Sequence, residues 1–262
     1  MSVVIVIPAR YASSRFPGKP LQPLTGLSGI SKPLIQHAWE AAKRVPDIDA
    51  VYVATDDERI EAVAHDFGAN VIMTDEDCRN GTERCAQAVI NHGIDADIIV
   101  NFQGDAPLTP PWFVKNLVDA MQLDCHIKMA TPVLEMDLKT LKQFKKDRGQ
   151  GRVGGTTAIF NHHNDALYFS KEVIPYCDES LLIEDKLPSF YHHVGVYAYR
   201  ALALKEYISW PESELERLEG LEQLRFLANG CPIKCIKVDA QGRKFWELNN
   251  PTDITLVEPC LD

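Results

Sequence analysis

The sequence predicts a three-layer α/β fold whose mostly parallel sheet is covered by helices on both faces. The apolar, β-branched run at residues 3–7 is typical of a strand buried on both faces in the middle of a parallel sheet. Short apolar runs then alternate with segments that have helical spacing of apolar residues. We find no internal repeat and no low-complexity segment, so one sheet with right-handed crossovers accounts for this alternation.

The expected elements begin or end at identifiable residues. Pro8 ends the first strand, and a helix at 34–44 closes before Pro46. A strand at 50–54 leads into residues 55–57, where a side chain can cap the next helix. Further strands are expected at 70–74, 98–102, 130–134, 166–170, 192–199 and 233–238, and further helices at 81–92, 213–229 and 251–257. The Lys-rich stretch at 139–148 fits either a helix or a solvated loop.

The composition is that of an ordinary globular protein. Of 262 residues, 45% are hydrophobic and 24% charged, and the net charge of -10 argues against a nucleic-acid partner. No leader pattern or apolar run of membrane-spanning length is present, so we expect no membrane association. Seven cysteines without a C-x-x-C pair fit reduced thiols, and we expect a cytoplasmic location.

A basic loop follows the first strand. Arg10, Arg15 and Lys19 lie there together with Gly18, at the carboxyl end of a strand, where open α/β sheets bind ligands. Guanidinium groups grip phosphate oxygens in pairs, and glycine lets the backbone approach closely. The loop therefore fits a polyphosphate site, with a merely solvated basic loop as the alternative. It is neither a Walker A loop nor a G-x-G-x-x-G loop.

An acidic residue follows the strand at 98–102. Asp105, preceded by Gly104, is well placed to hold a hard divalent cation facing the first loop. A lone aspartate in such a turn is also a common cap or Asx-turn. In the leucine-rich segment at 213–229, Ser213 and Glu216 can form a capping box, and the leucines fit a core or subunit contact. The polar pair at residues 222–223 has no explanation from this pattern.

Several segments carry a resemblance to a known family. The stretches IPARYASSRFPGKPL, NGTER, NFQGD, ALYFSK, HVGVYAY and LEQLRFL closely resemble the CMP-Kdo synthetases, cytidylyltransferases that activate 3-deoxy-manno-octulosonate for lipopolysaccharide synthesis. The first stretch is also similar to CMP-sialate synthetases, whereas HVGVYAY and LEQLR resemble the octulosonate branch. The match runs in order over nearly the whole chain.

The resemblance implies one cytidylyltransferase domain at 1–262, of the nucleotide-diphospho-sugar transferase type. Residues 1–128 would mainly bind the nucleotide, and residues 129–262 would form an added subregion for sugar binding and dimerisation. The implied partners are CTP and an acidic octulosonate, and the implied assembly is a homodimer. In the implied reaction the C2 hydroxyl of the sugar attacks the α-phosphorus of CTP and expels pyrophosphate, with Mg²⁺ as cofactor.

The resemblance also assigns residues, position by position. The implied nucleotide site consists of Arg10, Arg15, Lys19, Gly81, Arg84 and Gln103. The implied sugar site consists of Gln103, Lys171, His193, Tyr197, Glu222 and Gln223. The implied metal ligands are Asp105 and Asn249, and the implied catalytic residues are Lys19, Asp105 and Arg10.

Two departures from the family pattern bear on the acceptor. The family usually has G-V-D-T-P-E-D where this chain has ELNNPTD, so Asn249 replaces a metal-binding aspartate, and Glu247 could compensate for it. Lys171 stands where the family has arginine. The acceptor that the resemblance implies is therefore 3-deoxy-manno-octulosonate or its 8-amino-3,8-dideoxy analogue. The alternatives are a CMP-sialate-like synthetase, a glycosyltransferase and a catalytically weakened nucleotide-binding regulator.

Overall fold

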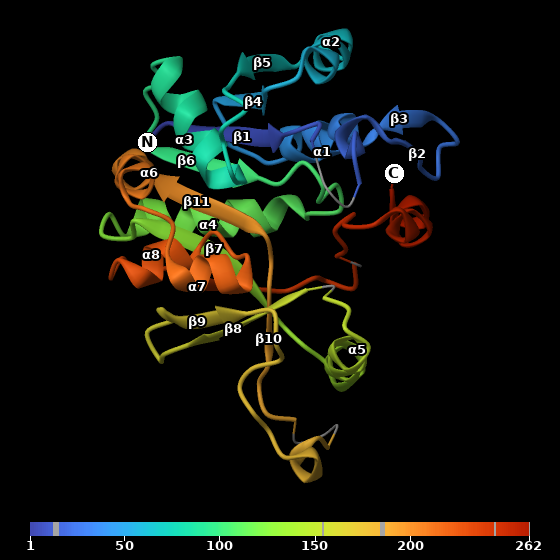
Figure 1. The fold of residues 1–262 in the computed structure, drawn as a ribbon, viewed down its shortest axis with the longest axis vertical. Coiled ribbons are helices and arrows are strands. Elements are labelled where there is room, and N and C mark those ends of the chain that lie inside the picture. Colours follow the sequence, from blue (N-terminus) through green and yellow to red (C-terminus); the bar gives the residue numbers. More distant parts are fainter. Residues whose placement is uncertain (13–15, 154, 184–186, 244, 262) are drawn as a thin grey trace.

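A computed structural model describes residues 1–12, 16–153, 155–183, 187–243 and 245–261, and it is built on one large sheet (Figure 1). The strands lie in the order β5-β4-β1-β6-β11-β7-β10-β8-β9, and β12 pairs with β7. Their bounds are β1 Val3–Ala9, β4 Ala50–Thr55, β5 Asn70–Met73, β6 Ile98–Phe102, β7 Met129–Glu135, β8 Thr156–Phe160, β9 Ala166–Ser170, β10 Tyr191–His193, β11 Val196–Arg200 and β12 Lys234–Val238. A separate hairpin consists of β2 (Pro23–Thr25) and β3 (Ser31–Pro33).

The two halves of the sheet differ in strand direction. Strands β5, β4, β1 and β6 are all parallel, and β12 runs parallel to β7. In the C-terminal half, β11 is antiparallel to both β6 and β7, and β10, β8 and β9 continue the antiparallel pairing. The parallel half therefore brings the carboxyl ends of β1, β4 and β6 to one edge of the sheet.

Helices cover both faces of the sheet. One face packs on α1 (Leu34–Lys43), α2 (Glu58–Asp66) and α4 (Pro111–Leu123), and the other on α3 (Gly81–Asn91), α6 (Ala201–Ser209) and α8 (Leu224–Ala228). Alternate residues of β1 point to opposite faces of the sheet. Ile5 and Ile7 pack in the core on the first face, and Val4 and Val6 pack in the core on the second. The predicted three-layer α/β fold is confirmed.

Two predicted elements are each interrupted at a glycine. The expected helix at 213–229 is split into α7 (Glu214–Glu219) and α8, because Gly220 adopts φ +60° and ends α7. The expected strand at 192–199 is split into β10 and β11 around Gly195. The predicted caps at Asp57 and at Ser213 with Glu216 are present. Helices α4 and α6 and strands β2, β3 and β8 were not predicted from the sequence.

The remaining elements form the periphery. Helix α5 (Leu138–Gly149) lies beside the antiparallel strands β8 and β10, and residues 171–183, which follow β9, project away from the sheet (Figure 1). The expected helix at 251–257 is a 3₁₀ turn, Pro251–Asp253, followed by α9 (Ile254–Val257). No helix in the described part of the chain is long and apolar enough to cross a membrane.

Candidate active site

A cavity of about 440 Å³ opens at the carboxyl ends of β1 and β6. These strands are neighbours in the parallel half of the sheet, so the loops that leave them face each other. Most of the residues that the sequence analysis singled out line this cavity, namely Arg10, Lys19, Gly81, Arg84, Gln103, Asp105, Tyr197, Glu222, Gln223 and Asn249. These ten predicted residues therefore share one cavity.

The first wall of the cavity, formed by the loops after β1 and β6, carries opposite charges. Strand β1 ends at Ala9, so Arg10 is the first residue of the loop. The amide of Gly18, which adopts φ +69°, donates to the carbonyl oxygen of Tyr11 at 3.0 Å and closes the base of this loop. Lys19 follows at once, and its Nζ lies 2.5 Å from Oδ2 of Asp105. The predicted opposition of a basic loop and a carboxylate is confirmed for Lys19, whereas Arg15 lies outside the described residues.

Oxygen donors gather beside this ion pair. The backbone amide of Leu248 donates to the carbonyl oxygen of Asp105 at 2.8 Å, which brings Glu247 and Asn249 to the site. Nδ2 of Asn249 lies 3.5 Å from Oε2 of Glu247. Burial, together with the charge of Asp105, raises the pKa of Glu247 to about 7. Two carboxylates and one amide oxygen fit a hard cation, although no group of three His, Cys, Asp or Glu side chains suited to a metal occurs among the described residues.

The start of α3 forms the second wall. Asn80 caps the helix, because its side chain accepts from the amide of Glu83 at 2.9 Å. A Cβ at Gly81 would lie 3.0 Å from Nε2 of Gln103, so only glycine fits without displacing a neighbour. Arg84 lies on the same wall with its guanidinium held by Asp56 at 2.8 Å. This wall therefore combines the backbone at Gly81, where no side chain intervenes, with a fixed guanidinium.

The third wall consists of polar side chains around the turn between α7 and α8. The hydroxyl of Tyr197 donates to Oε1 of Gln223 at 3.1 Å, and Nε2 of Gln223 is buried without a partner in the described part of the chain. Oε2 of Glu222 accepts from the amide of Thr82 at 3.0 Å. Burial, helped by the nearby charge of Glu216, raises the pKa of Glu222 to about 7. The wall thus presents hydrogen-bonding groups suited to hydroxyls.

Two of the predicted sugar-site residues do not line the cavity. His193 is buried behind the wall, with Nε2 hydrogen-bonded to the hydroxyl of Thr131 at 3.0 Å. Burial lowers its pKa to about 3, so the ring is neutral. The ammonium of Lys171 lies close to Gly220, which does line the cavity. The roles of both residues in sugar binding stay predictions.

Sequence reasoning missed part of the wall. Arg79, Glu212 and Glu216 also line the cavity. The capping box at Glu216 was visible in the sequence, but it pointed only to a helix start, because its partner Asn80 lies 136 residues away in the chain. Arg79 and Glu212 carried no signal of their own, since charged residues at loop positions are common.

Comparisons with known proteins agree with this geometry. A cytidylyltransferase family model matches residues 4–237. The 3-deoxy-manno-octulosonate cytidylyltransferase of Maricaulis maris is 43% identical over 98% of this chain and 96% of its own. The 8-amino-3,8-dideoxy-manno-octulosonate cytidylyltransferase of Shewanella pealeana is 37% identical over 100% of this chain and 99% of its own.

A solved structure supports the same assignment. A CMP:2-keto-3-deoxy-manno-octonic acid synthetase complexed with CTP superposes with a TM-score of 0.83 at 36% identity, covering 98% of this chain and 97% of that one. Sequence and fold therefore agree over almost the whole length. The chain belongs to the cytidylyltransferase family, in the group formed by the CMP-Kdo synthetases.

Proposed function

We propose that this protein transfers the cytidylyl group of CTP to an acidic eight-carbon sugar and releases pyrophosphate, as a step of lipopolysaccharide biosynthesis. The acceptor is 3-deoxy-manno-octulosonate or its 8-amino-3,8-dideoxy analogue. The observation that carries the proposal is the cavity itself, in which Lys19 faces Asp105 at the carboxyl ends of two parallel strands and Arg10 lines the same space. Relatives named for both sugars match this chain over nearly its full length.

Different parts of the cavity would bind different parts of the two substrates. Arg10 and Lys19 neutralise the triphosphate and the departing pyrophosphate, because fixed cations stabilise charge that develops on transferring phosphoryl groups. The start of α3 receives the cytosine, where Gly81 permits close approach. The polar wall with Tyr197 and Gln223 orients the sugar so that its C2 hydroxyl faces the α-phosphorus.

Magnesium fits the donor set beside Lys19. Asp105 would be the principal ligand, and the oxygens of Asn249 and Glu247 are the further donors within this cluster. Bound Mg²⁺ would add positive charge against the triphosphate and lower the pKa of a hydroxyl that it contacts. Asp105 holds Lys19 in the present arrangement, so we expect the lysine to shift toward phosphate when a cation takes its place.

The assembly proposed is a homodimer in the cytoplasm. Large apolar side chains are exposed on the projecting segment 171–183, where Tyr176 is 90% exposed and Leu181 and Ile183 are each 55% exposed. Apolar groups gathered on one projection favour burial against a second copy. Sedimentation velocity tests this directly, since a species near the monomer mass of 29.4 kDa would reject the dimer.

Pyrophosphate release tests the activity. The purified protein is incubated with CTP, Mg²⁺ and either octulosonate, and kcat/KM is compared between the hydroxyl and amino sugars. The proposal expects release that requires CTP and at least one sugar. No release with either sugar would reject the synthetase and favour a nucleotide-binding regulator. Release of CMP from a CMP-sugar, without pyrophosphate, would favour a glycosyltransferase.

A further inference from the structure

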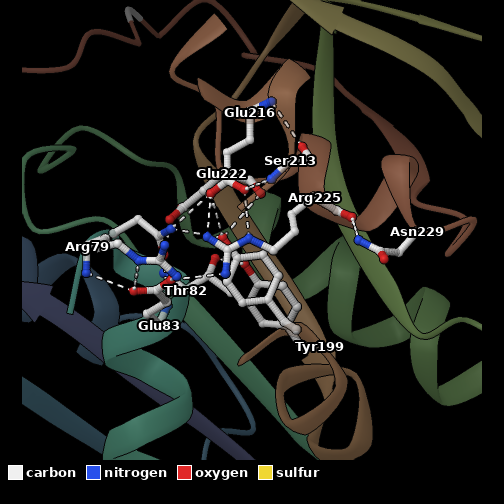
Figure 2. Close-up of polar contacts among 11 residues, drawn as sticks. Arg79, Thr82, Glu83, Tyr199, Ser213, Glu216, Glu222, Arg225 and Asn229 are labelled. Atoms are coloured by element: carbon white, nitrogen blue, oxygen red, sulfur yellow. Dashed lines mark hydrogen bonds and ion pairs between the residues drawn. The ribbon is translucent and has the colours of Figure 1, made fainter. Parts of the chain in front are cut away.

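A buried arginine lies behind the polar wall of the cavity. Arg225, on α8, has no exposed surface and is surrounded by charged groups (Figure 2). Its Nε and Nη2 donate to the two carboxylate oxygens of Glu216 on α7 at 2.7 and 2.6 Å. Its Nη1 donates to Oε1 of Glu83 on α3 at 3.0 Å. One guanidinium thus joins three helices.

Both carboxylates that Arg225 contacts are fixed by further partners. Glu83 also accepts from Nη2 of Arg79 at 2.5 Å. Glu216 accepts from Nδ2 of Asn80 at 3.3 Å, and Asn80 is the cap of α3. The guanidinium also stacks on the ring of Tyr207, 4.1 Å from its centroid. The corner formed by α7 and α8 is therefore attached to the start of α3 by buried charged groups.

A second attachment lies on the cavity side of the same corner. The carboxylate of Glu222 accepts from the amide of Thr82 at 3.0 Å, in the first turn of α3. Residues 220–223 form the turn between α7 and α8, so Glu222 and Gln223 lie between this front contact and the buried contact through Arg225. Glu222 lines the cavity, so a bound sugar would meet its carboxylate. Arg225 does not line the cavity, whereas Glu216, which it holds, does.

The helices that these contacts join differ in how far they are held by other contacts. Helices α7 and α8 have 6 and 5 residues, too few to hold a shape without tertiary contacts. Helix α3 has 11 residues and packs Cys85, Ala86 and Val89 into the core of the sheet. Loss of the contacts that Arg225 makes with Glu216 and Glu83 should therefore make α7 and α8 more mobile and leave α3 in place.

We propose that Arg225 is a positioning residue, which holds Glu222 and Gln223 at the sugar side of the cavity by bridging Glu216 to Glu83. The inference rests on the proposed function for the identity of the sugar, and on the contacts above for everything else. A planar guanidinium is needed, since only its fork reaches both oxygens of Glu216 and a third oxygen on another helix. If Arg225 had only a structural role, its substitution would lower the stability of the fold and would not weaken sugar binding selectively over CTP binding.

The test compares Arg225→Lys and Arg225→Met with Leu117→Ala, a core truncation on α4 that is remote from this corner. For both arginine variants we expect the sugar KM to rise about tenfold or more, because small misplacements of orienting groups are costly. The Kd for CTP should stay within about twofold of the wild-type value, as expected for separate sites. Leu117→Ala should lower Tm and leave both substrate constants unchanged.

A turnover-independent measurement keeps the inference separate from the proposed activity. Hydrogen exchange should speed up at residues 219–226 in Arg225→Met and stay unchanged in α3. If Arg225→Met does not fold, Arg225→Lys and Glu83→Gln, which breaks the bridge from its other end, decide the question. An unchanged sugar KM in a folded variant, or unchanged exchange at residues 219–226, would overturn the inference. Absence of wild-type activity would instead reject the proposed function.

Discussion

Nζ of Lys19 lies 2.5 Å from Oδ2 of Asp105, although 86 residues separate them in the chain. Lys19 begins a short 3₁₀ turn, Lys19–Leu21, that follows the loop after β1, and Asp105 lies in the turn after β6. The pairing of these parallel strands brings the two loops together. In the proposed function this internal ion pair would give way to phosphate on the lysine and a divalent cation on the aspartate.

Asp105→Asn should abolish turnover while the fold is retained. The amide keeps the shape of the side chain but removes the charge that a cation needs, so we expect kcat/KM to fall by about 10³-fold or more. The ion pair is partly exposed, so the change in stability should be at most about 1 kcal/mol. Pyrophosphate release and thermal unfolding measure the two effects, and a near-normal rate would remove Asp105 from its assigned role.

Gly81→Ala should weaken CTP binding. The new Cβ would meet Nε2 of Gln103 at 3.0 Å and Nδ2 of Asn101 at 3.3 Å, so the wall of the cavity must shift. We expect the Kd for CTP to rise by about tenfold, as for loss of one well-placed contact. Gly149→Ala is the matched control, because a Cβ there meets nothing within 4 Å. Equal CTP affinity in the two variants, measured by calorimetry, would contradict the placement of cytosine at α3.

Asn249→Asp should lower the Mg²⁺ concentration that the protein needs for activity. It adds a carboxylate beside Asp105 and Glu247, and a more negative site binds a hard cation more tightly. We expect the Mg²⁺ concentration for half-maximal rate to fall by about threefold or more, with a shift in preference between the two sugars. Magnesium titrations of the rate, repeated with each sugar, provide the measurement. Identical kinetics in the variant and the wild type would mean that this departure from the family pattern is incidental.

Glu222→Gln should flatten the pH dependence of stability. Because burial raises the pKa of Glu222 to about 7, the folded state holds this proton more tightly than the unfolded state does. The stabilisation is fully present below the unfolded pKa, near 4.5, and is lost as the pH rises toward 7. Glutamine keeps an acceptor for Thr82 without this loss, which for the wild type is of the order of 2–3 kcal/mol.

Urea unfolding at pH 5 and pH 8 measures this difference. The wild type should lose more stability than Glu222→Gln between the two values. Glu247, whose pKa is also raised to about 7, is present in both proteins and so cancels in the comparison. Parallel losses in the two proteins would show that Glu222 titrates in its usual range.

Much of the fold and the basic end of the site could be predicted from the sequence. The loop with Arg10 and Lys19 directly follows a strongly apolar strand, and Asp105 directly follows another, so local pattern and the rule for strand ends place all three. The family resemblance assigned most of the remaining wall.

The junction behind the wall could not be predicted in this way. Arg225 and Glu83 are 142 residues apart in the chain, and the sequence around each of them gives no indication of their contact. The leucine spacing favoured one continuous helix, yet Gly220 ends α7 and turns Glu222 and Gln223 to the cavity. At Gly195 a Cβ would lie 2.9 Å from Oε1 of Glu247, a close approach from a distant segment at the point where the predicted strand divides.

The most direct test of the central claim is a crystal structure of the protein with CTP bound. The account predicts the triphosphate against Arg10 and Lys19, with the cytosine at the start of α3 and Asp105 facing the phosphates. Density for CTP at another place on the protein, with this cavity unchanged and Lys19 still paired to Asp105, would contradict it.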